Sequence, residues 1–269
     1  MIEEEAYRRA RLDKARELGV DPYPIQANRT HTIDRVLDLF DNLAKAGEIL
    51  TIVGRIRGLR KHGGLTFLQV EDEHAKMQVA LKKDEIGQEL YEQFHEIFDV
   101  GDFIQCEGTL FRTKTDEQTL MVTKYRMLTK ALLPLPEKWH GLTDVETRSR
   151  KRYLDLLANP SVRHTFVLRS KLVQLIRQFF TDRDFMEVET PILQHQPGGA
   201  TAKPFKTHHN ALDMDLYLRV APELFLKRLL VGGYERVFEI ARCFRNEGID
   251  HDHNPEFTQI EFYWAYANR

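Results

Sequence analysis

The chain has 269 residues, which is long enough for two domains that each bury a core. Its formal net charge of −2 argues against a protein that holds nucleic acid by bulk positive charge, so any nucleic-acid site has to be a local patch or a base-reading pocket. The two cysteines lie in unrelated segments, so a disulfide framework is not expected and a cytoplasmic location is favoured. No apolar run approaches the roughly 20 residues of a membrane helix, so no membrane partner is expected.

Residues 1–48 predict a helical segment. A charged helix is expected over residues 3–18 and ends at Gly19, because glycine commonly closes a helix. A second helix follows Thr32, which is placed to cap it, and its apolar residues keep helical spacing until Gly47. Acidic and basic residues are interleaved along the first helix, so its simplest interpretation is a solvated face.

Residues 49–130 predict a small barrel. Short strands are expected over 50–59, 65–72, 76–82, 100–111 and 118–128. A turn is expected at Gly63-Gly64, and a helix over 84–98 follows the third strand. Five strands with a helix between the third and the fourth have the order of an OB-fold, whose face binds single-stranded nucleic acid.

Alternation along these strands separates the barrel interior from an outer surface. Arg55, Phe67 and Gln78 are expected to point outward on three successive strands. Phe67 is suited to stack on one unstacked base, and the arginine and the amide are suited to bind its edge. A single exposed phenylalanine is also common on protein surfaces, so the pattern alone leaves this open. The residues expected to point inward are Ile52, Ile56, Leu68, Val70, Met77, Val79 and Leu81.

Residues 131–158 contain two prolines in the sequence PLP and show no strand alternation at first, which predicts a hinge between domains. The sequence Asn-Pro-Ser at 159–161 then opens a long helix. A strand over 185–193 follows, with Pro191 near its end. By spacing alone the helix is an ordinary core helix. Its apolar residues at helical spacing are Val162, Phe166, Leu168, Leu172, Leu175, Ile176 and Phe179.

The next segment is a glycine-containing loop, a strand and a helix. Gly198 and Gly199 permit a positive φ or a close approach of the backbone to a ligand. A strand is expected over 214–220, and Glu223 begins a helix that runs to the next glycine pair. Taken alone, Glu223 in a first turn is explained by the helix dipole.

The last segment, 236–266, predicts two strands joined by a long polar loop at 246–256. Period-two alternation places Glu239, Arg245, Glu261 and Tyr263 on one face of this hairpin and apolar residues on the other. Such a polar set is costly on a covered sheet unless a charged ligand pairs with it. The hairpin is therefore expected to form the floor of a binding site.

The strings FRNEG at 244–248 and HNPEFTQIEFY at 253–263 resemble motif 2 of the class II aminoacyl-tRNA synthetases, and among these most closely the lysine enzymes. The strings PLP, GGATAKPF and RVAPELFLKR strengthen the resemblance. It implies an α+β protein: a five-stranded OB-fold β-barrel that binds an anticodon, followed at 159–269 by an incomplete class II catalytic domain with an antiparallel sheet. Because the family's catalytic domain continues past WAYANR, we expect a truncated chain that is a poor catalyst alone.

The resemblance implies ATP-dependent attachment of lysine to its tRNA through a lysyl-adenylate. This chemistry needs no side-chain nucleophile, so positioning and electrostatics carry it. Arg245 is the implied catalytic residue, because a planar guanidinium can contact the α-phosphate and the substrate carboxylate together. The alternative for Arg245 is an ion pair with Glu239 or Glu247. ATP and Mg²⁺ are the implied cofactors, with the metal ligands expected beyond residue 269.

No metal ligand is assigned within this chain, because His251 and His253 have no third ligand at a convincing spacing. The resemblance assigns three other sets of residues. The implied ATP-binding residues are Arg245, Glu247, His253, Asn254 and Phe257. The implied amino-acid-binding residues are Gly199, Glu223, Arg245, Glu261 and Tyr263. The implied anticodon-binding residues are Arg55, Phe67, Gln78 and Glu117. Several carboxylates complement the two ammonium groups of lysine, whereas an aspartate pocket needs a distal cation.

The implied partners are a lysine-accepting tRNA, lysine and a second copy of the chain, which would dimerise through residues 161–191. The resemblance also brings the first helix close to the tRNA. Aspartyl- and asparaginyl-tRNA synthetases share this architecture and are the nearest alternative. A free-standing tRNA-binding protein would keep the barrel without catalysis, and a regulatory paralogue would keep only the dimerising surface. A glycine-rich, arginine-bearing continuation of the reading frame would favour the enzyme.

Overall fold

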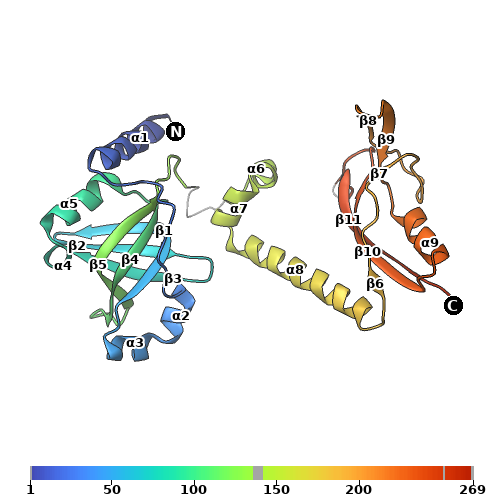
Figure 1. Cartoon of the computed structure of the whole chain (residues 1–269). Helices are drawn as coiled ribbons and strands as arrows, with labels where there is room; N and C mark the ends of the chain where they lie inside the picture. Colours follow the sequence, from blue (N-terminus) through green and yellow to red (C-terminus); the bar gives the residue numbers. More distant parts are fainter. Residues whose placement is uncertain (1, 136–141, 251, 268–269) are drawn as a thin grey trace. The chain divides into compact units, whose positions relative to one another are not determined.

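The computed structural model describes residues 2–135, 142–250 and 252–267, and the chain divides into two compact units, Met1–Pro160 and Ser161–Arg269 (Figure 1). The segment expected as a hinge, 131–158, falls in the first unit, and its residues 136–141 lie outside the described residues. In the described part of the chain, no helix combines the length and the apolar character that a membrane span requires.

The first unit contains the predicted five-stranded barrel. The strands close in the order β1-β2-β3-β5-β4, which confirms the OB-fold. They are β1 (Leu50–His62), β2 (Leu65–Glu71), β3 (Lys76–Lys82), β4 (Phe103–Arg112) and β5 (Gln118–Thr129). The helix predicted between the third and fourth strands forms as two pieces, α4 (Lys83–Ile86) and α5 (Gln88–Ile97). It is divided because Gly87 has φ +86°, outside the range of a right-handed helix.

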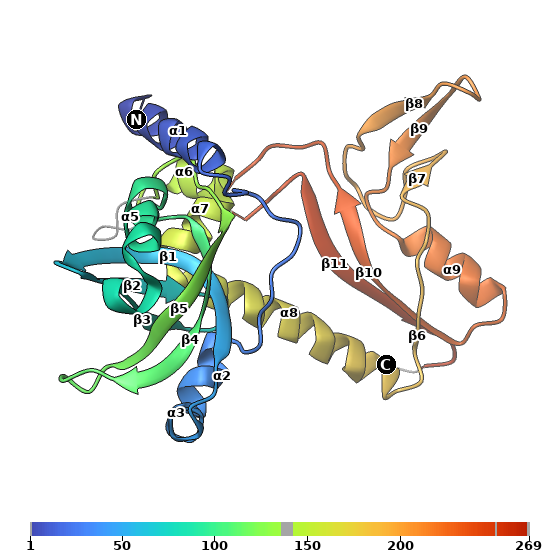
Figure 2. The same cartoon turned by 60° about the vertical axis from the view of Figure 1, so that its left-hand side comes forward.

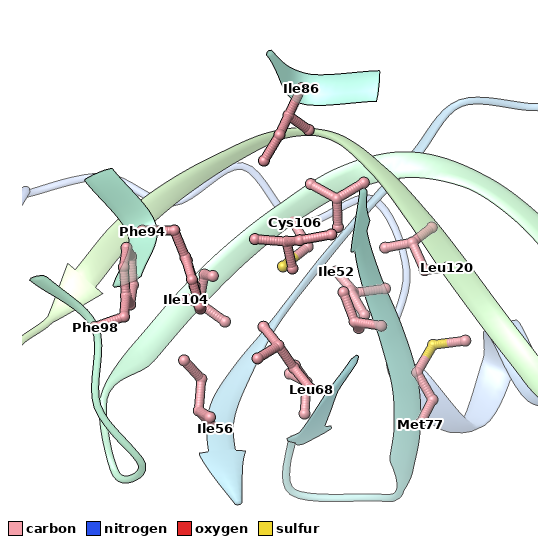
Figure 3. Packing of buried hydrophobic residues seen from close by; sticks show 14 of the residues in the cluster. Ile52, Ile56, Leu68, Met77, Ile86, Phe94, Phe98, Ile104, Cys106 and Leu120 are labelled. Atoms are coloured by element: carbon pink, nitrogen blue, oxygen red, sulfur yellow. The ribbon is translucent and has the colours of Figure 1, made fainter. Parts of the chain in front are cut away.

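The barrel interior holds the largest core of the chain. Every residue that alternation predicted to point inward is buried, as expected for a strand whose side chains alternate between two faces. Helix α5 closes the interior through Phe94, whose ring stacks on that of Phe98 with centroids 4.7 Å apart. Figure 3 shows members of this core, with Phe94 and Phe98 next to Ile104 and with Cys106 near the centre.

The amino-terminal helices are fastened to the barrel. They are α1 (Ile2–Glu17), α2 (Ile33–Asp38) and α3 (Phe40–Ala46). The solvated-face interpretation of α1 is wrong for one side, where the buried Arg8 donates to the carbonyl of Val100 at 3.0 Å. The expectation that Thr32 caps α2 through its side chain is also wrong. The Asp72 carboxylate accepts from the Ile33 amide at 2.8 Å instead, because folding places this acid at the helix start.

Two short helices, α6 (Val145–Arg150) and α7 (Arg152–Ala158), complete the first unit. The carboxylate of Asp155 in α7 is fully buried and accepts from the side chains of Arg148, Arg152 and Asn159. A buried charge requires such compensation. Helices α6 and α7 are therefore joined by hydrogen bonds and ion pairs centred on Asp155.

The second unit contains two three-stranded sheets, with strand orders β11-β10-β6 and β7-β9-β8 (Figure 2). Its elements are α8 (Pro160–Thr181), β6 (Met186–Glu187), β7 (Leu193–Gln194), β8 (Lys206–His209), β9 (Met214–Leu218), α9 (Glu223–Val231), β10 (Arg236–Phe244) and β11 (Glu256–Trp264). The pairing is antiparallel except between β6 and β10. The strand expected over 185–193 forms only at its two ends, which pair in different sheets, β6 with β10 and β7 with β9. Pro191, which has no amide to donate, lies in the gap between them.

The core of the second unit is aromatic. Phe180 of α8 stacks on Phe238 of β10 with ring centroids 5.0 Å apart, and Phe185 packs against them. Most of the predicted apolar series of α8 remains exposed, including Leu172 and Leu175, so the core-helix interpretation is wrong for that face. Helix α9 packs against β10 and β11, and so brings the start of this helix to the hairpin (Figure 1).

Candidate functional site

The β10–β11 hairpin forms with the register that alternation predicts. Glu239 pairs with Glu261, and Val237 pairs with Tyr263. Directly paired residues share a face of the sheet, so Glu239, Glu261 and Tyr263 lie on the same face. The loop at 245–255 joins the two strands, and its ends are held together because the Arg245 amide donates to the Pro255 carbonyl at 2.8 Å.

One residue of the expected floor is not free for a ligand. Glu239 is only 3% exposed, and its carboxylate accepts from Arg219 at 2.6 Å and from the Thr190 hydroxyl at 2.7 Å. Arg219, which follows the apolar end of β9, is not among the residues predicted for the site. A lone arginine beside an apolar strand end was the available signal, because a buried arginine requires a partner. Glu239 therefore has a structural role beneath the surface of the expected binding site, where its carboxylate is hydrogen-bonded to Arg219 and Thr190.

Glu261 has the opposite environment. Its Oε1 accepts from the Gln259 side chain at 2.9 Å, but its Oε2 is buried and has no hydrogen-bond partner among the described residues. Burial raises the pKa of Glu261, and the neighbouring carboxylates of Glu223 and Glu239 raise it further. A buried carboxylate with an unused oxygen, surrounded by other carboxylates, favours a cationic ligand.

Glu223 and Gly199 complete this carboxylate cluster. Gly199 has φ +90°, and a Cβ at this position would lie 2.8 Å from the Cβ of Glu223, so glycine is required there. The Glu223 carboxylate accepts from Lys227 at 2.5 Å. Burial raises the pKa of Tyr263 to about 12, and the charges of Glu261 and Glu223 contribute. The structure therefore brings together the predicted Gly199, Glu223, Glu261 and Tyr263, and adds Lys227.

A pocket of about 180 Å³ lies at the loop end of the hairpin. The Arg245 guanidinium lies 4.9 Å from the centroid of the Phe257 ring, and the two planar groups form one wall. The buried Nε of Arg245 has no hydrogen-bond partner within the described residues, which is unusual for a buried polar group. The pocket is lined by Arg245, Glu247, Gly248, Asp252, His253, Asn254, Pro255 and Phe257.

All five residues expected to bind ATP therefore line one pocket. The loop is fixed to the glycine-containing segment, because Asn246 donates to the Lys203 carbonyl at 2.7 Å and the Lys203 amide donates to Glu247 at 3.2 Å. His253 lies 2.8 Å from the Asp250 carboxylate, and this hydrogen bond lowers the pKa of Asp250. His251 lies outside the described residues. Among the residues that are described, no three His, Cys, Asp or Glu side chains form a group that could hold a metal.

A second pocket, of about 470 Å³, lies on the outer surface of the barrel. It brings together the predicted Phe67, Gln78 and Glu117. The Gln78 amide donates to the Thr119 hydroxyl at 2.9 Å, which fixes its orientation. The other side chains that offer polar groups to this pocket are Arg60, Gln69, Lys76 and Thr115.

Arg55, which was expected beside Phe67, does not line this pocket. Its guanidinium lies 4.2 Å from the centroid of Phe103 and donates to the Gly101 carbonyl at 3.0 Å, and burial lowers its pKa. The β1–β2 register explains the difference, because Arg60 is the residue that pairs with Phe67. Counting outward from the predicted Gly63-Gly64 turn gives this partner, since hairpin residues at equal distances from a two-residue turn face each other.

Comparison with known proteins agrees with both units. Residues 50–128 match the family model of the OB-fold nucleic acid binding domain. Residues 144–269 match the model of the class II tRNA synthetases (D, K and N). The barrel pocket and the hairpin sites thus lie in two separate matched regions.

Curated relatives give the same result at high identity. The lysine–tRNA ligase of Roseiflexus castenholzii is 52% identical over 262 residues, which cover 97% of this chain and 54% of the relative. The lysine–tRNA ligase of Carboxydothermus hydrogenoformans is 50% identical over 96% of this chain and 52% of the relative. That of Magnetococcus marinus is 50% identical over 98% and 53%.

The chain spans about half the length of the curated relatives it matches. Within that span, the predicted barrel and the predicted motif 2 hairpin both occur where the family models match. The chain therefore carries an OB-fold nucleic acid binding domain together with residues of a class II tRNA synthetase domain of the D, K and N group.

Proposed function

We propose that this chain serves the ATP-dependent attachment of lysine to its tRNA through a lysyl-adenylate. The observation that carries the proposal is the order of groups along one face of β11. Phe257 lines the loop pocket, and Glu261 and Tyr263 follow on the same face. At about 3.3 Å per residue, Phe257 and Glu261 are roughly 13 Å apart along the strand. A nucleotide and an amino acid can thus bind side by side.

Lysine is the amino acid that fits the carboxylate cluster. The unused Oε2 of Glu261 is surrounded by negative charge from Glu223 and Glu239, which suits an ammonium group. A distal carboxylate, as in aspartate, would add a further negative charge to this cluster. The names of the curated relatives, lysine–tRNA ligases, support the same choice.

ATP fits the loop pocket through Arg245 and Phe257. The unpaired Nε of Arg245 can donate to an α-phosphate, and the planar pair of guanidinium and phenyl ring presents a surface for adenine. Arg245 would hold the phosphate and the lysine carboxylate in the same orientation, and so reduce the entropy cost of bringing them together. Mg²⁺ bound with ATP would neutralise phosphate charge, and its ligands are not among the residues assigned here.

Calorimetry on this chain tests the proposed binding of lysine and ATP. We expect lysine to bind more tightly than aspartate, and Arg245→Ala to weaken ATP binding at least tenfold, as for loss of a charged hydrogen bond. Arg242→Ala is the matched control, because Arg242 lies in β10 shortly before Arg245 but pairs with Glu256 on the opposite face. Tighter binding of aspartate, or an equal loss from both arginine variants, would contradict the proposal.

We also propose that the barrel pocket binds a base of the U-rich anticodon of a lysine-accepting tRNA. Phe67 would stack on the base, while Gln78, Glu117 and Arg60 would contact base edges or the backbone. Phe67→Ala should weaken binding of an anticodon stem-loop about 5- to 150-fold, the range of one base–aromatic stack. Phe103→Ala is the control, because Phe103 packs on Arg55 and does not line the pocket. Unchanged stem-loop binding by Phe67→Ala would overturn this assignment.

The exposed apolar face of α8 supports the proposed homodimer. Phe166, Leu168, Leu172, Leu175 and Phe179 are all exposed in the described unit. Contiguous apolar surface of this kind marks an interaction site. Sedimentation should show a dimer that Leu172→Glu dissociates, whereas Ile25→Glu, a change at an exposed apolar residue of the first unit, leaves it intact. A monomeric parent chain would contradict the proposal.

A further inference from the structure

The β1–β2 turn next to the barrel pocket is held by the helical segment that follows β3. The Tyr91 hydroxyl of α5 donates to the carbonyl of Gly63 at 3.0 Å. The carbonyl of Gly64 accepts from the Lys83 amide at 2.8 Å. Both residues of the turn are thus bonded to groups outside the hairpin. Because Arg60 and Phe67 are the third pair from this turn, its position determines where the two side chains enter the pocket.

Tyr91 belongs to a buried chain of three hydrogen-bonding side chains. The Thr66 hydroxyl lies 2.8 Å from the Tyr91 oxygen and 2.9 Å from Nε2 of His95. Each hydroxyl has a single proton, and that of Tyr91 goes to Gly63. The Thr66 hydroxyl therefore donates to Tyr91 and accepts from Nε2–H of His95. The chain runs in one direction, from α5 to the turn.

Thr66, the middle member of this chain of hydrogen bonds, is next to the proposed base-stacking residue. Thr66 directly precedes Phe67, and alternate side chains of a strand point to opposite faces. Thr66 is fully buried against α5, so fixing it also fixes the direction of Phe67 toward the pocket. On the other strand, the ring of His62 meets the edge of Phe67 with centroids 6.4 Å apart. Phe67 is thereby restrained from both strands of the hairpin.

We propose that Tyr91, Thr66 and His95 are positioning residues for nucleic-acid binding, which hold Phe67 and Arg60 ready to receive an unstacked base without touching it themselves. This inference rests on the proposed function of the barrel pocket. The physical advantage is preorganisation: a stacking ring that is already fixed loses less conformational freedom when the base binds. Removing the chain should therefore reduce the affinity that Phe67 provides.

Tyr91→Phe is the central variant, because it removes the one hydroxyl that reaches the turn. Tyr125→Phe is the matched control, because the Tyr125 hydroxyl donates to the carbonyl of Leu90 at 2.5 Å, away from the pocket residues. Binding is measured for a U-rich anticodon stem-loop and for loops that are abasic at each anticodon position in turn. The stacked position is identified by comparing Phe67→Ala with the parent chain on each abasic loop. It is the position whose abasic loop binds the two proteins equally well.

We expect Tyr91→Phe to weaken binding of the intact loop about 2- to 10-fold, the size of one neutral hydrogen bond, and to leave binding of that abasic loop unchanged. Tyr125→Phe should bind both loops as the parent chain does. In the Phe67→Ala background, Tyr91→Phe should have a smaller effect than in the parent chain, because only Arg60 is left to be positioned. His95→Gln, which keeps a side-chain N–H donor, should retain affinity that His95→Leu loses.

The outcomes separate the two proposals. If Phe67→Ala binds the intact loop as well as the parent chain does, the proposed base pocket itself is wrong. If Phe67→Ala weakens binding but Tyr91→Phe does not, the positioning role is overturned. An equal loss from Tyr91→Phe for intact and abasic loops would also overturn it, because that result describes a general loss of structure.

Discussion

The Arg219 guanidinium donates to the Glu239 carboxylate at 2.6 Å, and both side chains are only 4% exposed. Arg219 also donates to the carbonyl of Thr190 at 3.0 Å and to that of Arg242 at 2.8 Å. One arginine thus links β10 to the segment before β7. Both oxygens of Glu239 are thus hydrogen-bonded, to Arg219 and to the Thr190 hydroxyl, which leaves Glu261 as the carboxylate of the hairpin pair with an unused oxygen.

We predict that Arg219→Ala lowers the free energy of unfolding of the second unit by about 3–5 kcal/mol, because it leaves the Glu239 charge buried and without its partner. Arg177→Ala breaks the largely exposed pair with Glu187 and should cost at most about 1 kcal/mol. Hydrogen exchange of β10 amides in increasing urea measures both. Equal effects of the two substitutions would contradict the structural role of Arg219.

Glu261→Gln should weaken lysine binding and stabilise the fold at the same time. The substitution removes a carboxylate expected to bind an ammonium group, so affinity should fall about 10- to 150-fold, as for loss of a charged hydrogen bond. The pKa of Glu261 is raised above 4.5 in the folded chain, so its charge opposes folding at neutral pH. Urea unfolding at pH 7 should therefore show a more stable variant.

The same pKa gives a pH dependence. As the pH falls through the raised pKa of Glu261, the carboxylate gains a proton and lysine affinity should decrease, beginning above pH 4.5. In Glu261→Gln this decrease should be smaller, because the titrating group is gone. Calorimetry from pH 8 downward is the measurement, and a parallel decline in the parent chain and the variant would remove Glu261 from the lysine site.

Gly199→Ala should weaken lysine binding at least tenfold, because the new Cβ would meet Glu223 at 2.8 Å and displace it. Gly233→Ala is a close control: its φ of +102° imposes a similar backbone strain, but nothing lies within 4 Å of its Cβ. Both variants should lose stability, and only Gly199→Ala should lose lysine affinity. Comparable affinity losses in calorimetry would show that strain alone accounts for the effect.

His95 should make the first unit less stable in acid. Burial lowers the pKa of His95 from its ordinary value of 6.5, and the charges of Lys61 and Arg11 lower it further. The unfolded chain then binds a proton that the folded chain does not, so stability is full above about pH 6.5 and decreases as the pH falls toward the folded pKa.

His95→Gln cannot gain this proton, so its urea-unfolding free energy should decrease less between pH 7.5 and pH 5.5 than that of the parent chain. His74→Gln is the control, because His74 is exposed in the turn between β2 and β3. If His95→Gln and the parent chain lose equal stability over this interval, another group is responsible for the acid sensitivity.

Local pattern was enough to predict much of the fold. The period of two in β1, β2 and β3 identified the barrel interior, since a strand side chain has only two faces to choose from. Gly19 and Gly47 marked the ends of helical segments, where positive φ is needed. The five residues of the loop pocket that were predicted to bind ATP lie close together in the sequence, and a hairpin keeps such neighbours close in space.

By itself, then, the sequence determined the order of the elements, the faces of the strands and the residues at the end of the hairpin. Tertiary structure decided which groups from distant parts of the chain meet. Arg60 lies beside Phe67, as the register set by the Gly63-Gly64 turn requires, whereas folding places Arg55 against Phe103 of β4. Glu239 is paired because folding brings Arg219 from another strand end, and alternation carries no information about contacts so distant in the chain.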